Sequence, residues 1–404
     1  MGLKPRSMIG ANLLVAGLLL AACGSAASPP PASSPGTVGS PPSAAKPSAS
    51  SSAAPATGAS TAASGKPSAA ASTAAGSSAA SPAGSQAPVT LKVGTQHVAT
   101  DGPLYIAQEK GFFKAQGVNV QFTDINGNEA ISAVATGQLD VSVGAIYSGL
   151  FNAIARGVNI RLVATKGSVE DQPPASGKHS SGLVLRTQVA PSIKDWKDLK
   201  GKKIAIASRG ATQEESLDTG LKKGGLTIAD VNIQTMPFPD TLPALANGSI
   251  DGSMELQPWI VQGTKQGILV FWKDTAEMTP GLQTNALTFG PSIPKMGQNA
   301  GNRFMVAYTE GLRYYNDAIG PKHANWDEFV NIMIKNTSLK DRTLYDQVGW
   351  TYESPNCSLN MATIGNNLDW YMAHGYVKDK VDLKTAVDDS YCQAAVKQLG
   401  PYKA

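Results

Sequence analysis

The amino-acid sequence predicts an α/β protein whose folded part, from Pro88 to Ala404, forms two lobes joined by a hinge. Strand patterns alternate with helix patterns, a weak internal repeat relates two segments, and polar stretches separate the copies. The 317 residues of this part are too many for one typical core and enough for two. We therefore expect a first lobe of residues 88–182 plus 286–404, and a second lobe of residues 183–285.

The segment Leu91–Phe113 combines a strand, a polar loop and the start of a helix. Leu91 and Val93 alternate with polar neighbours, and the pattern ends in small and hydrogen-bonding residues at positions 94–97. Gly102 and Pro103 then suit a helix start, and Gly111 suits its end. In a parallel sheet, such a loop lies at the carboxyl end of a strand, where ligands bind. Thr95, Gln96 and His97 are therefore candidate ligand contacts.

Three pieces of this lobe recur later in the chain. Residues 91–95 resemble 204–208 and residues 118–120 resemble 231–233, both at a shift of 113, while 135–142 resemble 246–253 at a shift of 111. Chance similarity between generic α/β elements remains the alternative. If the repeat is real, the loop at 95–97 corresponds to the loop at 208–212, and 144–147 corresponds to 255–259. Two such sheet edges facing each other would form a cleft.

The remaining segments supply the hinge and a helical end. Residues 167–181 are polar and contain proline, and the apolar runs at 183–185 and 286–289 could carry the chain across and back. Apolar residues recur at helical spacing in 304–315 and 325–334. We expect helices there, with aromatic side chains that pack in the core.

The N-terminus has the features of an export signal. Lys4 and Arg6 precede the apolar run at 13–20, and the sequence Leu-Ala-Ala-Cys ending at Cys23 resembles the lipobox of bacterial lipoproteins, in which the cysteine is acylated. Residues 24–87 are almost wholly Ser, Ala, Pro, Gly and Thr, which indicates a disordered tether. We expect a lipid-anchored protein on the extracytoplasmic side of the membrane. An ordinary signal peptide or a short uncleaved anchor are the alternatives.

Charge and cysteine usage narrow the function further. After residue 87 the chain has 30 basic and 30 acidic residues, and this balance argues against a nucleic-acid partner. Cys357 and Cys392 form an even pair, which in an exported protein favours a disulfide over two free thiols. The four histidines are scattered without ligand spacing, so we expect no metal site. We also expect no cofactor.

The order of several motifs resembles a known family. They are G-T-x-x-x-A-T-x-G-P-L-Y-I-A-x-E-x-G-F-F from Gly94, D-L-K-G-K-K-I-A-I from Asp198, A-N-G-S-I-D from Ala246, and D-W-Y-M-A-H-G-Y from Asp369. Together they look like the solute-binding proteins of ABC importers for nitrate, sulfonates, taurine and thiamine-pyrimidine precursors. The resemblance implies a type II periplasmic-binding-protein fold, a small-molecule solute, an ABC permease as partner, a monomer and no enzymatic activity.

The resemblance also implies a set of ligand-binding residues. They are Thr95, Gln96, His97, Asn128, Ala145 and Tyr147 in the first lobe, and Ser208, Arg209, Thr212, Glu255, Gln257 and Trp259 in the second. Gln257 stands where the family often has a glutamate before proline, which weakens the expectation of a cationic ligand. Arg209 could pair with a sulfonate or carboxylate, and Trp259 could stack on a planar ligand or belong to the core.

Two other functions remain open from the sequence. A ligand-sensing module for a membrane receptor would have the same features as a transport protein. A pyrimidine-synthesis enzyme shares the fold, but its cysteine-rich motif and cofactor-binding lysine are not visible in this sequence. The solute is expected to be sulfonate-like, nitrate-like or taurine-like, or a planar aromatic such as a pyrimidine.

Overall fold

A computed structural model describes residues 87–125, 127–297, 299–351 and 353–403. The expected signal peptide, the acylated Cys23 and the tether up to residue 86 lie outside the described residues. Within the described part, no helix is both long enough and apolar enough to cross a membrane.

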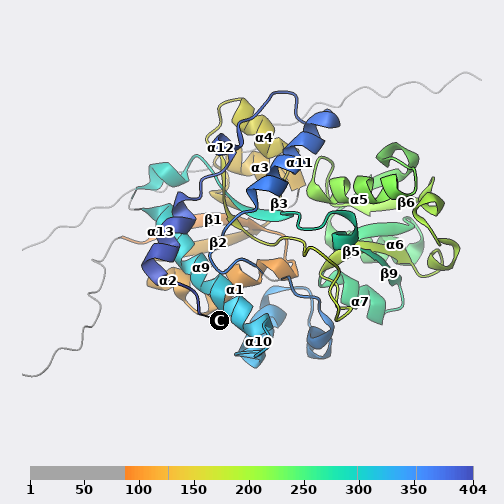
Figure 1. Ribbon diagram of the computed structural model, residues 1–404. Coiled ribbons are helices and arrows are strands. Elements are labelled where there is room, and N and C mark those ends of the chain that lie inside the picture. The colour runs from red at the N-terminus through yellow and green to blue at the C-terminus, as the bar shows by residue number, and fades with distance from the viewer. Residues whose placement is uncertain (1–86, 126, 298, 352, 404) are drawn as a thin grey trace, which may run out of the picture. The chain divides into compact units, whose positions relative to one another are not determined.

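Two five-stranded sheets organise the described chain (Figure 1). The first sheet has the order β2-β1-β3-β10-β4, with β1 (Val89–Thr95), β2 (Val118–Asp124), β3 (Val141–Ala145), β4 (Arg161–Thr165) and β10 (Asn285–Phe289). The second sheet has the order β7-β6-β8-β5-β9, with β5 (Ser181–Arg186), β6 (Lys203–Ile206), β7 (Asn232–Thr235), β8 (Gly252–Leu256) and β9 (Leu269–Asp274). β10 and β5 run antiparallel to their neighbours, so each sheet has the same order and the same reversed strand.

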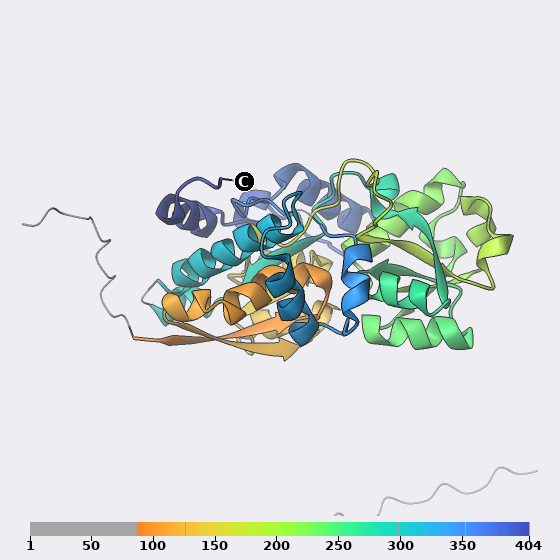
Figure 2. The same ribbon diagram turned by 90° about the horizontal axis from the view of Figure 1, so that it is seen from below.

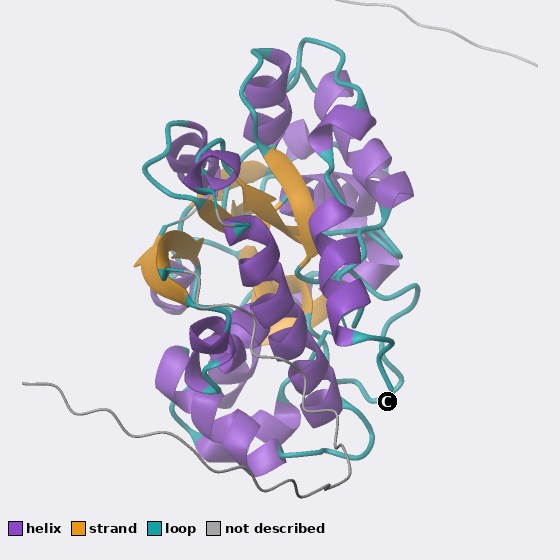
Figure 3. Ribbon diagram, turned by 90° about the vertical axis from the view of Figure 1, so that its left-hand side faces the viewer, coloured by secondary structure: helices purple, strands orange, loops and turns teal. Residues whose placement is uncertain are grey.

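Helices cover both faces of each sheet (Figures 1 and 3). On the first sheet, α3 (Gly127–Ala135), α4 (Ser148–Ala155), α11 (Met361–Ala373) and α12 (Leu383–Ala386) lie on one side. The other side carries α1 (Gly102–Glu109), α2 (Phe112–Ala115), α9 (Ala300–Ile319) and α13 (Ser390–Leu399), with α10 (Trp326–Asn336) packed on α1 and α9. On the second sheet, α5 (Thr212–Lys223) and α8 (Thr275–Met278) lie on one face, and α6 (Phe238–Asn247) and α7 (Trp259–Lys265) on the other. The helices expected at 304–315 and 325–334 are therefore confirmed, as parts of α9 and α10.

The register of the strands reveals how the two lobes repeat. Val93 of β1 pairs with Val141 of β3, and Ile204 of β6 pairs with Gly252 of β8. Both residues of the second pair lie 111 positions after their counterparts (93 to 204 and 141 to 252). The expected match of Leu91 with Ile204, a shift of 113, is wrong by two residues. Because side chains in a strand alternate with a period of two, a two-residue slip leaves the buried face unchanged and is invisible to a comparison of alternation.

A pair of aspartates explains why one repeated piece is the clearest in the sequence. The backbone N–H of Lys92 donates to Asp140 Oδ2 at 2.8 Å, and that of Lys203 donates to Asp251 Oδ2 at 2.9 Å. Each aspartate returns a backbone N–H to the carbonyl of the same lysine, at 2.9 and 2.8 Å. The same residue type therefore ties the start of the same strand pair in both lobes.

The chain crosses between the lobes twice, between β4 and β5 and between β9 and β10. The two crossing segments lie side by side, since Ser168 and Gln283 form an antiparallel bridge and Val169 N–H donates to the Leu282 carbonyl at 2.8 Å. The Gln283 side chain donates to the Gly167 carbonyl at 3.0 Å and ties the two segments together. Two crossing segments that are hydrogen-bonded to each other suit a hinge, because they can bend together without separating.

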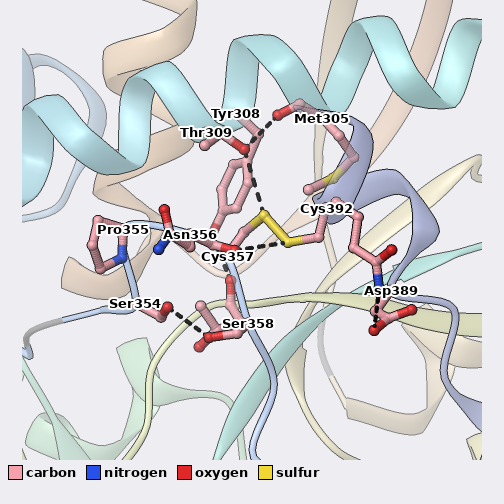
Figure 4. The surroundings of a disulfide bond; sticks show 12 residues. Met305, Tyr308, Thr309, Ser354, Pro355, Asn356, Cys357, Ser358, Asp389 and Cys392 are labelled. Carbon is pink, nitrogen blue, oxygen red and sulfur yellow. Dashed lines mark hydrogen bonds between the residues drawn. A yellow bond between two sulfur atoms is a disulfide. The ribbon is translucent and has the colours of Figure 1, made fainter. Parts of the chain in front are cut away.

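Two close contacts hold the C-terminal helices on the first lobe. Figure 2 shows α9 running along α1, and a Cβ on Gly311 of α9 would lie 2.2 Å from the Pro103 carbonyl oxygen of α1, so only glycine permits this approach. Cys357 and Cys392 are joined in a disulfide with their Cα atoms 5.9 Å apart. Figure 4 shows it next to Met305, Tyr308 and Thr309 of α9, so the bond links α13 to the segment before α11 within the core.

Candidate functional site

A cavity lies between the two lobes, at the carboxyl ends of the parallel strands β1, β3, β6 and β8. The volume that the centre of a water molecule could occupy is about 50 Å³. In this arrangement of the lobes, the cavity suits a few water molecules or a small solute. Six of the twelve residues expected to bind ligand line it: Gln96, Ala145, Tyr147, Thr212, Glu255 and Gln257.

Asp101 positions the loop that follows β1. Its Oδ2 accepts the backbone N–H groups of Gln96 at 3.2 Å and Val98 at 3.1 Å, and its Oδ1 lies 2.7 Å from Lys166 Nζ. Asp101 and Lys166 are both almost fully buried. The carboxylate thus fixes the backbone that presents Gln96 and Val98 to the cavity, as a helix-start aspartate would.

The same loop turns His97 away from the cavity. His97 has a left-handed backbone with φ of 54°, and its Nδ1 lies 3.0 Å from the Asn336 carbonyl oxygen and 3.1 Å from the Tyr105 hydroxyl. Thr95 is buried within the first lobe and is not part of the cavity wall either. Of the three candidates in this loop, the structure places only Gln96 on the wall.

Tyr147 forms part of the wall contributed by the first lobe. Burial raises the pKa of its phenol to about 12, although a hydrogen bond with the Gln96 side chain acts in the opposite direction. Tyr147 is therefore neutral at physiological pH and offers a ring face and a hydroxyl. Its backbone forms an isolated antiparallel bridge with Ala211 of the second lobe, which brings the two lobes together beside the cavity.

Asn128 and Ser208 close the rim of the cavity instead of lining it. The Asn128 amide donates to Ser208 Oγ and to the Arg209 carbonyl, both at 3.1 Å, so the first lobe is bonded to the second at this point. The neighbouring Ser148 N–H donates to the Gly210 carbonyl at 2.8 Å. These contacts exist only when the lobes are together.

The Arg209 side chain forms an ion pair with a carboxylate of its own lobe. Its guanidinium pairs with Glu214 Oε1, which also accepts from the Tyr376 hydroxyl at 2.9 Å, and Glu214 Oε2 accepts the Gly210 N–H at 2.8 Å. Arg209 does not line the cavity. The expected pairing of Arg209 with an anionic solute is not supported by this arrangement, because its guanidinium is bonded to Glu214 of its own lobe.

Glu255 lies on the wall at the end of β8 and is 1% exposed. Burial raises the pKa of its carboxyl to about 8, while hydrogen bonds from the Thr241 hydroxyl at 2.7 Å and the Leu256 N–H at 3.2 Å lower it. The raised pKa means that this group is mostly protonated at neutral pH.

The amide of Gln257 explains the departure from the family pattern. Its Nε2 donates to the His179 carbonyl at 2.8 Å, and its Oε1 accepts the Val261 N–H at 3.3 Å. The position requires one donor and one acceptor, which an ionised glutamate cannot supply because it only accepts. The glutamine is therefore matched to its surroundings in the protein.

Trp259 lies behind the wall. It is 4% exposed and stacks on Phe238, with ring centroids 5.5 Å apart. Of these two rings, Phe238 lines the cavity and Trp259 does not. The sequence pattern pointed to Trp259 instead of Phe238, because Phe238 begins α6 and lies outside the compared strand-end loops. Trp259 supports Phe238 from the core.

Several wall residues were not expected from the sequence. Most come from the crossing segments and helix starts, and they include Thr100, Gly167, Ser168, Val169, Ser180, Ser181, Gln213, Ser216, Phe238, Met254, Thr275, Thr284, Asn285 and Thr351. The shift of 111 would have pointed to one of the other wall residues, since it aligns Gln96 with Ala207, which also lines the cavity. Among the described residues, no group of three or more His, Cys, Asp or Glu could hold a metal ion.

A fold of two such sheets enclosing a cavity at their strand ends is the type II periplasmic-binding-protein fold. The structure is similar to the alkanesulfonate-binding protein SsuA of Xanthomonas axonopodis pv. citri bound to MOPS, with a TM-score of 0.60, 16% identity, and coverage of 75% of this chain and 99% of that one. It is also similar to the periplasmic nitrate-binding protein NrtA of Synechocystis PCC 6803, with a TM-score of 0.61, 16% identity, and coverage of 78% and 90%. The expected fold class is confirmed.

The sequence comparison identifies the family. Residues 99–318, more than half of the chain, match the family described as NMT1/THI5 like, and the chain belongs to it. A protein of Bacillus subtilis (strain 168), named as an aliphatic sulfonates-binding protein, is 22% identical over 324 residues, which are 76% of this chain and 88% of the relative. A 4-amino-5-hydroxymethyl-2-methylpyrimidine phosphate synthase of Aspergillus parasiticus is 26% identical over 38% of this chain and 42% of its own. The family resemblance expected from the motifs is confirmed, and the family includes both binding proteins and an enzyme.

Proposed function

We propose that this protein is an extracytoplasmic solute-binding protein, anchored by lipid at Cys23, that captures a small organic solute between its lobes and delivers it to an ABC importer. The observation that carries the proposal is a cavity enclosed by both lobes at the strand ends, with hydrogen bonds across its rim. Membership of the family and likeness to sulfonate-binding and nitrate-binding proteins support it. The export signal and lipobox of the sequence support the location.

The proposed contacts are the six expected residues on the wall, together with Phe238. Gln96, Tyr147, Thr212, Glu255 and Gln257 supply polar groups, and Phe238 and the Tyr147 ring supply apolar surface. Likeness to binding proteins over most of the chain favours binding over catalysis.

Closure of the lobes offers a direct test. Gly210 has φ of 64°, and a Cβ there would lie 2.3 Å from Ser148 Oγ of the first lobe. Even if the Ser148 hydroxyl rotates away, this Cβ would lie 3.2 Å from both Ser148 Cβ and the Tyr376 ring of the first lobe, so Gly210→Ala should disfavour closure and weaken solute binding. Gly201→Ala is the matched control, because Gly201 has φ of 74° with no atom within 4 Å of its Cβ position, so it introduces the same backbone strain without the contact.

The assay is a thermal shift with the small-molecule fraction of a growth medium, followed by mass spectrometry of the bound solute. A solute at a hundred times its dissociation constant should stabilise the protein by about 2.7 kcal/mol. We expect the Gly201→Ala protein to keep this shift and the Gly210→Ala protein to lose most of it. The proposal fails if the unaltered protein retains no solute, or if both variants bind equally well. Loss of membrane association in Cys23→Ser would test the anchor separately.

A further inference from the structure

The charged and polar residues on the cavity wall indicate the charge of the solute that the cavity can bind. Among the lining residues that the structure describes, none is lysine, arginine or histidine, and Glu255 is the one acidic residue. The other polar groups are hydroxyls and amides, such as Gln96, Thr212 and Gln257. A wall of this kind offers hydrogen bonds without a positive charge.

The basic side chains closest in sequence to wall residues are each paired with a carboxylate of the protein. The pairs are Lys166 with Asp101 at 2.7 Å, His179 with Asp274 at 2.6 Å, and Arg209 with Glu214. Lys166 and Asp101 are 1% and 0% exposed, so neither can turn toward the cavity without leaving a buried charge alone. None of these three basic residues lines the cavity.

Carboxylates also lie beside the N-termini of two helices that begin at the cavity. The N-terminus of a helix favours an anion because its first N–H groups lack partners. α5 begins on the wall at Thr212 and carries Glu214 in its first turn, and α8 begins on the wall at Thr275 with Asp274 accepting the Ala276 N–H at 2.7 Å. Each of these two helix starts therefore has a carboxylate of the chain beside it.

An anion would lose its water in this cavity and gain no countercharge. Moving a carboxylate-sized ion out of water costs several kcal/mol unless a partner compensates, whereas an uncharged polar solute loses little if its hydrogen bonds are replaced. The wall can replace them: the buried Thr100 hydroxyl has no hydrogen-bond partner among the described residues, and the Tyr147 phenol offers a further polar group. A protonated Glu255 could also form a hydrogen bond with the solute.

We propose that the cavity selects an uncharged, hydrogen-bonding organic solute and rejects sulfonates, nitrate and carboxylates. This inference rests on the proposed function and narrows its substrate class. Glu255, the one acidic group on the described wall, supplies no countercharge to an anion in either protonation state. This specificity would separate the chain from the sulfonate-binding and nitrate-binding proteins whose fold it shares.

The test uses the full protein and begins with mixtures of solutes sorted by charge. A yeast-extract small-molecule pool is divided by ion exchange at pH 7 into anionic, uncharged and cationic fractions, and each is assayed by thermal shift. In parallel, methanesulfonate is compared with methanesulfonamide, and benzoate with benzamide and benzylamine, by calorimetry. These probes keep a similar shape and differ in charge.

The inference is supported if the uncharged fraction raises the melting temperature and the other two fractions do not. It is also supported if each amide binds at least tenfold more tightly than its charged analogues. A shift confined to the anionic or cationic fraction, or tighter binding of any charged probe, overturns the inference and leaves the proposed function standing. No shift with any fraction, and no binding of any probe, overturns both.

Discussion

Replacing Glu255 by glutamine should change how stability depends on pH. Burial raises the pKa of this carboxyl from 4.5 to about 8 in the folded protein. In the unfolded chain the group ionises near 4.5, so above that pH the folded state binds more protons than the unfolded state, and stability falls as the pH rises toward 8. At pH 7 the loss is on the order of 3 kcal/mol, from 1.36 kcal/mol for each of about 2.5 pH units.

Glutamine removes this loss because it does not ionise, and its carbonyl can still accept the hydrogen bond from the Thr241 hydroxyl of α6. The assay is urea unfolding of both proteins at pH 5 and pH 7. Glu215 and Glu353, whose pKa values burial also raises to about 8, titrate in both proteins and cancel in the comparison.

We expect Glu255→Gln to gain about 2.5 kcal/mol over the unaltered protein between these two pH values. Asp379→Asn, a change at an exposed loop residue, is the control and should show no such gain. Equal pH dependence of the Glu255→Gln and unaltered proteins would refute the argument that burial without a cation holds this carboxyl protonated.

Four other substitutions test the site. Gln257→Glu should lower the free energy of unfolding by about 1 to 3 kcal/mol at pH 7, because the new carboxylate faces a backbone carbonyl that now receives a hydrogen bond; unchanged urea unfolding would contradict this role. Asp101→Asn should cost about 3 kcal/mol in the same assay, since it leaves Lys166 buried without its partner, and a loss below about 1 kcal/mol would exclude a strong pair. Gln96→Ala should weaken solute binding in calorimetry, whereas His97→Ala should leave affinity within about twofold, because only the first lies on the cavity wall; equal effects would mean that the loop is placed wrongly.

Much of the fold was accessible from the sequence because it depends on local pattern. The strand and helix starting at Leu91 and Gly102 follow from alternation and from proline at the first turn, and β1 and α1 occupy those positions. The two-lobed repeat was visible through Asp140 and Asp251, which make the same backbone contacts in each lobe. Its shift could not be fixed by alternation alone, because a two-residue slip preserves the buried face.

The candidate site was only partly accessible, since proximity in sequence does not decide which way a side chain points. Gln96 and His97 are adjacent, yet the left-handed backbone at His97 directs that ring toward Asn336. Trp259 follows a strand and was a reasonable ligand contact, but Phe238 from another helix lies in front of it.

The sequence by itself determined the fold class, the repeat, the expected export and anchoring signals and the family, because each is encoded in periodicity or in motifs of neighbouring residues. Only the tertiary structure decided the charge of the cavity. In the sequence, Arg209 and Lys166 are basic residues close to the predicted site. In the structure, Arg209 forms an ion pair with Glu214, and Lys166 forms one with Asp101. Electrostatic pairing depends on distance in space, and the chain establishes that distance only when it folds.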